Sequence, residues 1–431
     1  MKRFNKTIFR NGLTLVTEKM PGTQSVCIGV WVKVGTRHEQ KNEAGLSHFL
    51  EHMVFKGTKY KSALELSQEI EQVGGEFNAY TTREYTCFHI TLLAKDAGLA
   101  LNILGDIILN SNFNPTEFQR ERQVVLQEIA EGEDDHAVLV QDLYWKSVYG
   151  KSGLGALILG TESSIKKTSR KDLVRFFQRH YRPEKVLISV AGNISHENIK
   201  RKLKKFTGHW PNRDKTVAKP VLKQPYTKPK FQNGCWWAVK KNAEQVHIQW
   251  GVESVNYSSK DRFAAYLLSY YLGGGTSSAL YQEVREKQAL AYSVFADIES
   301  CSDAGFFSAS VSTKMNNVTK CLNIIENKVK ALQSTPLNSE ELKNIKDTLK
   351  GKLLLLSGNV EVRMSSIAKN LMFLGQTSNI KAVCRQIDAV TPEDIQKIAQ
   401  KMFRRKRSIL LLGPPPSKQL KAKLKPQFLD R

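Results

Sequence analysis

The sequence predicts an α+β fold made of two similar halves, each with a mostly antiparallel β-sheet packed against helices. Three observations support this prediction. The chain has 431 residues, which is too many for one hydrophobic core. Each half contains alternating apolar residues, typical of strands, together with helix-start signals. A lysine-rich segment between the halves carries prolines at 211, 220, 225 and 229, which indicates a domain boundary.

That boundary divides the chain into three parts. We expect an N-terminal domain over residues 1–213, a basic linker over 214–233 and a C-terminal domain over 234–431. The first domain is expected to carry the metal site described below, and the second to contribute residues that contact substrate.

The first half begins with paired strands, because apolar residues alternate across 12–34. A helix is predicted over 44–56. Ser62-Ala63-Leu64-Glu65 reads as a capping box, which opens a second helix that stops at Gly74-Gly75. The elements predicted next are strands at 76–82 and 85–94, a helix capped by Asp96 and running to 110, a helix over 115–132 that starts at Asn114-Pro115, a strand at 185–192 and a basic helix at 196–206.

The second half repeats this plan. The elements predicted for it are strands near 235–252, helices at 259–272 and 277–288, strands at 290–298 and 304–312, and then long helices. Aligning Gly57-Thr58 with Gly275-Thr276 puts Tyr266, Ser269 and Tyr270 at the positions of His48, Glu51 and His52. The second half is therefore expected to be a copy of the first that lacks metal ligands.

Composition argues against several classes of protein. No apolar run reaches the roughly 18 residues that a membrane span needs, and the start of the chain shows neither a secretion signal nor a transit peptide. The net charge is +24, but the excess of Lys and Arg gathers in 198–242 and 401–425, which we interpret as a solvated linker and tail. Nucleic-acid binding is therefore not expected. The six scattered cysteines are expected to be reduced.

The segment His48-Phe49-Leu50-Glu51-His52 carries the strongest functional signal. Two histidines four residues apart lie on one face of a helix, so both imidazoles can reach one metal ion. Glu51 directly precedes His52, which puts a carboxylate beside a metal-bound water. This spacing is the reverse of the His-Glu-x-x-His helix and is typical of inverzincin zinc peptidases.

A catalytic zinc takes three protein ligands and leaves one position for water. The helix predicted over 115–132 offers Glu117, Glu121, Glu128 and Glu131 as the third ligand. Glu121 and Glu128 are seven residues apart and share one helix face, and the residues alone do not choose between them. With one zinc per chain, Glu51 would act as general base toward the water that the metal activates.

The chain resembles the pitrilysin / insulysin / mitochondrial processing peptidase family nearly from end to end. The matching blocks are Asn11-Gly12-Leu13, His48 to Thr58, Gly74 to Thr81, Glu121 to Ile129, Ala191-Gly192-Asn193, Leu272 to Ser278 and Arg285 to Ser293. Glu128 follows His52 at the spacing of the family's third ligand, so the resemblance implies that Glu128 binds zinc and Glu121 supports it.

The same resemblance implies how substrate would be held. Arg285 and Tyr292 match family residues that reach substrate and the oxyanion, and Asn78-Ala79 match an edge strand to which extended peptides add. It also implies a clamshell around a chamber that admits short or unfolded peptides, including basic ones. The length suits a two-domain bacterial member resembling processing peptidases, in the cytoplasm, paired as a homodimer or with a homologous subunit.

Two other functions are weighed against the peptidase. Some relatives have lost their ligands and serve as scaffold or partner subunits, but His48, Glu51, His52 and Glu128 are all present in this chain. A basic nucleic-acid-binding protein is the weaker alternative, because the basic segments lack interleaved aromatic residues apart from Trp236-Trp237.

Overall fold

The structure is a computed structural model that describes residues 4–150, 152–207, 210, 228–418, 420, 422 and 424. The chain divides into two compact units, each assembled from three segments. Unit 1 consists of residues 1–130, 156–225 and 354–378, and unit 2 of residues 131–155, 226–353 and 379–431. Each unit contains one sheet, and both sheets are mostly antiparallel, as predicted.

The sheet of unit 1 has six strands in the order β1-β2-β6-β3-β5-β4. The strands are β1 (Phe4–Ile8), β2 (Thr14–Lys19), β3 (Ser25–Val32), β4 (Glu76–Thr81), β5 (Thr86–Leu93) and β6 (Val186–Gly192). β2 and β6 pair in parallel and all other neighbours pair antiparallel. β4 is an edge strand, a position that matters for the site.

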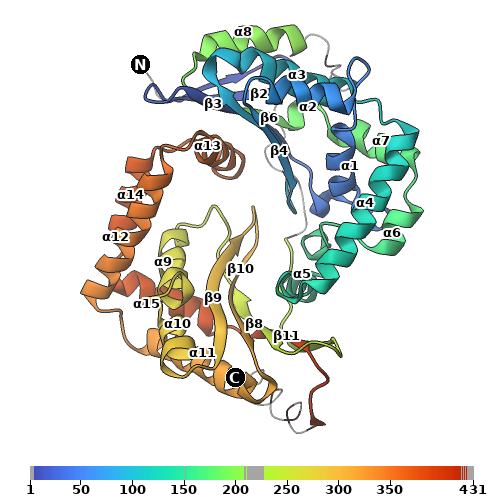
Figure 1. The fold of residues 1–431 in the computed structure, drawn as a ribbon. Coiled ribbons are helices and arrows are strands. Elements are labelled where there is room, and N and C mark those ends of the chain that lie inside the picture. Colours follow the sequence, from blue (N-terminus) through green and yellow to red (C-terminus); the bar gives the residue numbers. More distant parts are fainter. Residues whose placement is uncertain are drawn as a thin grey trace. The chain divides into compact units, whose positions relative to one another are not determined.

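Helices cover one face of this sheet (Figure 1). They are α1 (Leu46–Val54), α2 (Ala63–Glu71), α3 (Ala97–Asn110), most of α4 (Pro115–Asp134), α6 (Glu162–Lys167), α7 (Arg170–His180) and α8 (His196–Thr207). Alternate residues of β3, namely Val26, Ile28, Val30 and Val32, point into this core. The predicted capping box at Ser62 is confirmed, because its side chain accepts the backbone N–H of Glu65.

The opposite face of the same sheet is covered by α13 (Val360–Leu374), a helix from the second half of the sequence. In Figure 1 it lies on the side of the sheet away from α3 and α8. Trp31 of β3 donates its indole N–H to Met364 Sδ at 3.2 Å, and Arg363 pairs with the buried Glu18 at 2.8 Å. A Cβ at Gly29 would collide with Met364, so the glycine permits this close approach.

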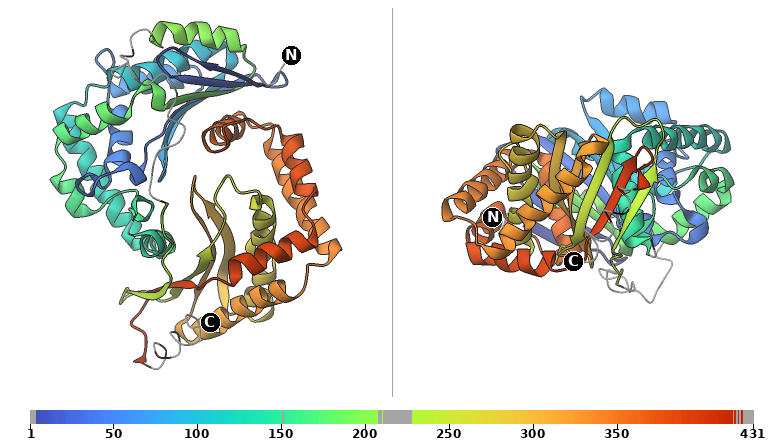
Figure 2. Two further views of the ribbon diagram at one scale, coloured as in Figure 1. Left: turned by 180° about the vertical axis from the view of Figure 1, so that it is seen from behind. Right: turned by 90° about the horizontal axis from the view of Figure 1, so that it is seen from below.

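The sheet of unit 2 repeats the arrangement with five strands in the order β7-β11-β8-β10-β9. The strands are β7 (Gly234–Val239), β8 (Val246–Glu253), β9 (Ala291–Ser300), β10 (Gly305–Thr313) and β11 (Ser408–Gly413). β11 pairs in parallel with β7, just as β6 pairs with β2. The view from below in Figure 2 shows β11 in red among the yellow-green strands.

The interpretation of 401–425 as a solvated tail is wrong for its central part. β11 is buried along its whole length and lies between two partners in the sheet of unit 2. The interpretation was based on the lysines and arginines of this segment. The apolar run Ile409-Leu410-Leu411-Leu412 instead forms a buried strand in the core of the sheet.

One helix from the first half of the sequence belongs to unit 2. This is α5 (His136–Tyr149), which packs on β8 and β11 through Tyr144, Trp145 and Val148.

The other α-helices described in unit 2 are α9 (Arg262–Gly273), α10 (Ala279–Tyr281) with a π-helical turn over Gln282–Lys287, α11 (Val318–Ser334), most of α12 (Ser339–Leu356), α14 (Ile380–Asp388) and α15 (Pro392–Phe403).

The compact units differ from the predicted division at 213 and 234. Each sheet is apolar on both faces, so it requires helices on both. α5 and α13 each cover the second face of a sheet made from the other half of the sequence. Of the predicted linker, residues 214–227 lie outside the described residues.

Two further expectations concern local structure. Asp96 does not cap α3 through its side chain, because a 3-10 turn over Ala94–Asp96 leads into the helix and leaves Asp96 outside the extended conformation of an N-cap. None of the six cysteines, all of which lie in the described part of the chain, forms a disulfide, which agrees with the expected reduced state. None of the helices within the described part of the chain is long and apolar enough to span a membrane.

Candidate metal centre

The candidate site is built on α1, a helix with one buried apolar face and one partly exposed polar face. Its apolar positions Leu46, Phe49, Leu50, Met53 and Val54 are buried in the core of unit 1. The helical period leaves His48, Glu51 and His52 on another face, partly exposed. The packing of α1 therefore fixes the direction in which the two imidazoles and the carboxylate point.

Both imidazoles converge on one carboxylate of α4. Glu128 Oε2 lies 3.6 Å from His48 Nε2 and 3.5 Å from His52 Nε2. Among the described residues, these three are the one group of His, Cys, Asp or Glu whose donor atoms lie within 4.8 Å of one another. The two sequence candidates for a third ligand are thereby separated, because Glu128 faces both Nε2 atoms.

This donor set fits a zinc ion. Two imidazole nitrogens and one carboxylate oxygen form a common ligand set for catalytic zinc. Donor atoms of a tetrahedral zinc are about 3.3 Å apart when each lies about 2.0 Å from the metal. The separations of 3.5 and 3.6 Å are close to that value, so the three side chains need only a small movement to hold the ion.

Glu121 contacts the other nitrogen of His52. Its Oε2 lies 3.1 Å from His52 Nδ1, and its Oε1 lies 2.8 Å from Lys56 Nζ. A carboxylate on Nδ1 fixes the tautomer of a ligating histidine and directs Nε2 toward the metal. Lys56, just beyond α1, is a contact that the sequence reasoning missed.

The ionisation of these groups follows from burial and from their pairing. Burial lowers the pKa of His48 to about 4, so its imidazole is neutral near pH 7. Burial also disfavours the charged form of His52, but hydrogen bonds to Glu121 and Glu128 outweigh it and raise the pKa to about 9. The hydrogen bond from His52 lowers the pKa of Glu128. Burial opposes the charged form of Glu121, but its hydrogen bonds to His52 and Lys56 lower its pKa. The carboxylates of Glu121 and Glu128 therefore stay ionised beside the imidazoles.

Glu51 is held by a neighbouring strand. The Thr81 hydroxyl, at the end of β4, donates a 2.6 Å hydrogen bond to Glu51 Oε2. Burial raises the pKa of Glu51, and the hydrogen bond from Thr81 opposes that rise. Sequence reasoning did not single out Thr81, although the alternation along β4 places it on the same face as Phe77 and Ala79, the face that α1 packs against.

Asn78 and Ala79 lie on β4 at the edge of the sheet. Within the described residues β4 pairs with β5 alone, with Asn78 opposite His89 and Ala79 opposite Phe88. The backbone N–H of Ala79 donates to the Asn78 side chain at 2.8 Å. This N–H is therefore turned away from β5, toward the side where a further strand would lie.

Arg285 and Tyr292 lie in unit 2 and contact each other. The guanidinium of Arg285 stands 4.2 Å from the centre of the Tyr292 ring, and its Nη1 donates to the Tyr292 carbonyl at 3.1 Å. Tyr292 is 78 % exposed. The structure thus brings these two residues together in unit 2, while the candidate metal ligands and Glu51 belong to unit 1.

The comparisons with known proteins cover almost the whole chain. Residues 14–162 match the model of the insulinase family, peptidase family M16, and residues 167–349 match the model of the peptidase M16 inactive domain. An uncharacterized zinc protease of Bacillus subtilis is 35% identical over 405 residues, covering 94% of this chain and 97% of the relative. An uncharacterized zinc protease of Streptomyces coelicolor is 31% identical, covering 96% and 90%.

Solved structures share the fold. A protease from Helicobacter pylori superposes with a TM-score of 0.89 at 22% identity, over 95% of this chain and 99% of the other. A peptidase M16 inactive domain from Pseudomonas fluorescens gives a TM-score of 0.85 at 16% identity, over 96% and 99%. Taken with the two family models and the curated relatives, this shows that the chain belongs to the insulinase family, peptidase family M16.

Proposed function

We propose that this chain is a zinc endopeptidase that hydrolyses short or unfolded peptides. The observation that supports it most is the approach of His48, His52 and Glu128 to one point, with the Glu51 carboxylate on the same helix face. Relatives named zinc proteases agree with this reading. One zinc per chain would be held by the two Nε2 atoms and Glu128 Oε2.

When bound, zinc acts as a Lewis acid that polarises the scissile carbonyl and lowers the pKa of a water molecule. Glu51 then serves as the general base. Thr81 occupies Glu51 Oε2, so Oε1 accepts the proton of the attacking water and later passes it to the leaving amine. Burial raises the pKa of Glu51 toward neutral pH, and a general base is most effective when its pKa lies near the pH at which it works.

Substrate would bind as an added strand along β4. The outward backbone groups of Ala79 would pair with an extended peptide, with the Asn78 side chain beside them, and such pairing tolerates many side chains. Folded proteins do not present extended backbone, so this mode selects short or unfolded polypeptides, among them basic ones that resemble presequences.

The remaining parts of the proposal concern unit 2 and the assembly. Arg285 and Tyr292 would bind substrate and the developing oxyanion across a chamber that the two halves enclose as a clamshell. Tyr266, Ser269 and Tyr270 stand where ligands would be in a second metal site, which agrees with an inactive second domain. We further propose a cytoplasmic enzyme that works as a homodimer or with a homologous subunit.

The test combines bound metal with peptide cleavage for the wild type, Glu51→Gln and His48→Ala. We expect about one zinc per chain in the wild type and in Glu51→Gln, with turnover of a quenched basic peptide lowered about a hundredfold to ten-thousandfold in the latter. His48→Ala should lose both zinc and activity.

Other outcomes point elsewhere. Zinc without cleavage in the wild type, with the homologous partner absent, would favour a scaffold or partner subunit. A folded, metal-replete wild type that retains no zinc would overturn the peptidase proposal.

A further inference from the structure

The N-terminus of α1 has no cap of its own. Its N-cap residue is Gly45, at φ +87° in the left-handed region, and glycine has no side chain to accept a backbone N–H. The first intrahelical hydrogen bond runs from Phe49 N–H to the Gly45 carbonyl. The N–H groups of the first turn, which ends at His48, therefore need partners from elsewhere in the chain.

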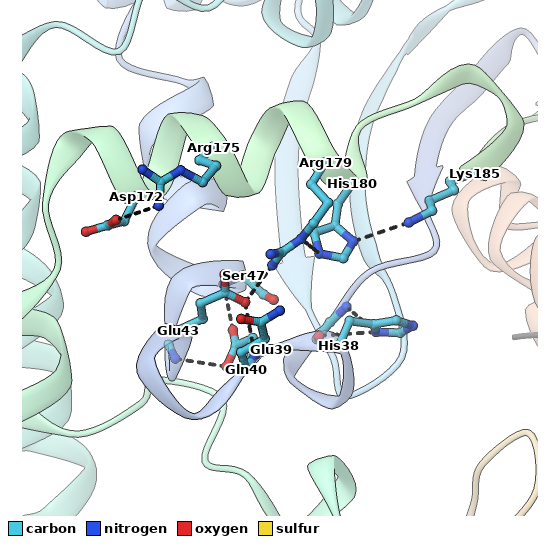
Figure 3. A network of polar contacts seen from close by, with 12 residues as sticks. His38, Glu39, Gln40, Glu43, Ser47, Asp172, Arg175, Arg179, His180 and Lys185 are labelled. Carbon is cyan, nitrogen blue, oxygen red and sulfur yellow. Dashed lines mark hydrogen bonds and ion pairs between the residues drawn. The ribbon is translucent and has the colours of Figure 1, made fainter. Parts of the chain in front are cut away.

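A buried carboxyl group supplies two of those partners. Glu39 Oε2 accepts the N–H of Gly45 at 3.0 Å, and Oε1 accepts the N–H of Ser47 at 2.7 Å. Figure 3 shows the Glu39 side chain lying against the turn that carries Ser47. Both carboxyl oxygens of Glu39 therefore accept hydrogen bonds from the N-terminus of α1, from residues six and eight positions further along the chain.

We propose that Glu39 is a positioning residue for the metal site, because it closes the first turn of α1 and so fixes His48 one turn from His52. This inference rests on the proposed zinc site. His48 is the third residue of α1, so fraying of that turn would release one of the two imidazoles. A helix terminus that is already closed before zinc arrives removes an ordering cost from metal binding.

Burial raises the pKa of Glu39 to about 8, while its hydrogen bonds to the α1 N-terminus oppose the rise. In either protonation state both carboxyl oxygens retain acceptor capacity for a backbone N–H. An amide does not, because its NH₂ group only donates. Glu39→Gln therefore removes one of the two contacts with α1 while it keeps the shape of the side chain.

The same loop offers a matched control in Glu43. Its Oε2 accepts the backbone N–H of Gln40 at 3.0 Å and pairs with Arg179 of α7 at 2.6 Å. Figure 3 shows Arg179 reaching from α7 toward Glu43. Glu43→Gln weakens an ion pair in this cluster but leaves both contacts between Glu39 and α1 intact.

The experiment measures zinc affinity by competition with a chelating dye, using the full chain, together with the melting temperature of the metal-free protein. We expect Glu39→Gln to raise the zinc dissociation constant about tenfold, the effect of losing one helix cap. Glu43→Gln should keep the wild-type zinc affinity, even if its melting temperature falls by as much as that of Glu39→Gln. An affinity of Glu39→Gln within twofold of the wild type would overturn the inference.

A second measurement covers the case in which Glu39→Gln does not fold. Hydrogen exchange of the metal-free wild type should show the amides of Gly45 and Ser47 protected as strongly as those inside α1. Rapid exchange at both would overturn the inference and leave the proposed function standing. A wild type that binds no zinc would instead overturn the proposed function, so the two failures are distinguishable.

Discussion

The Thr81 hydroxyl lies 2.6 Å from Glu51 Oε2 and donates a hydrogen bond to it. Thr81 closes β4, the proposed substrate strand, and Glu51 lies on α1, the proposed metal-binding helix. One hydrogen bond therefore joins the strand that would bind peptide to the carboxylate that would take the proton.

Removing the Thr81 hydroxyl should slow turnover without loss of metal. Valine keeps the volume of threonine but cannot donate, and a hydrogen bond to a charged group contributes about 1.5–3 kcal/mol. We expect kcat of Thr81→Val to fall at least about tenfold, with zinc content unchanged. Thr81→Ser should restore most of the rate. Equal losses in both variants would show that the packing of the whole threonine side chain, and not its hydroxyl alone, sets the rate.

Glu121 should tune the affinity for zinc. Its carboxylate holds His52 Nδ1 at 3.1 Å, and loss of such an outer partner weakens metal binding about 10- to 100-fold. We expect this loss in Glu121→Gln, measured by chelator competition. Glu117→Gln is the control, since it removes a carboxylate of α4 that pairs with the exposed Arg120. If Glu117→Gln loses as much zinc affinity as Glu121→Gln, the loss would reflect a general disturbance of α4 and not the contact between Glu121 and His52.

Tyr292 should act on the reaction through its hydroxyl alone. Tyr292→Phe keeps the ring beneath Arg285, whereas the loss of an oxyanion donor lowers kcat about 10²- to 10³-fold. Tyr281 provides the comparison, because Arg285 also stands 5.0 Å from its ring. We expect Tyr281→Phe to cleave a quenched peptide at nearly the wild-type rate. Wild-type kcat in Tyr292→Phe would contradict the oxyanion role.

Acid should destabilise the metal-free protein through buried histidines. Burial lowers the pKa of His38 from 6.5 to about 4. The unfolded chain then binds more protons between pH 6.5 and 4, so stability present above pH 6.5 is lost as pH falls through that window. The contribution is on the order of 3 kcal/mol at 1.36 kcal/mol per pKa unit.

Urea unfolding of the metal-free protein at several pH values measures this loss. His38→Asn keeps a polar side chain near Gly35 but cannot take up a proton, so its stability should fall less steeply between pH 6.5 and 4. The difference between the two proteins isolates His38 from the other histidines. Parallel pH curves would show that His38 is not the source of the acid sensitivity.

Local signals in the sequence predicted most elements of the fold. The capping box at Ser62 and the alternation over 76–94 depend on neighbours within a few residues, and both match α2, β4 and β5. β11 was missed because its short apolar run is flanked by basic residues on one side and prolines on the other. Nothing within that segment indicates that its partners β7 and β8 lie more than 150 positions earlier.

The sequence by itself determined which side chains of α1 share a face, because helical geometry fixes the spacing of His48, Glu51 and His52. It also narrowed the candidate third ligand to Glu121 or Glu128, which lie two turns apart on one helix face, and the family resemblance favoured Glu128. Only the tertiary structure placed Glu128 at the Nε2 atoms and Glu121 at Nδ1 of His52. The distinction depends on how α4 packs beside α1, and that packing, like the crossing of α5 and α13 between the sheets, is set by contacts between distant segments.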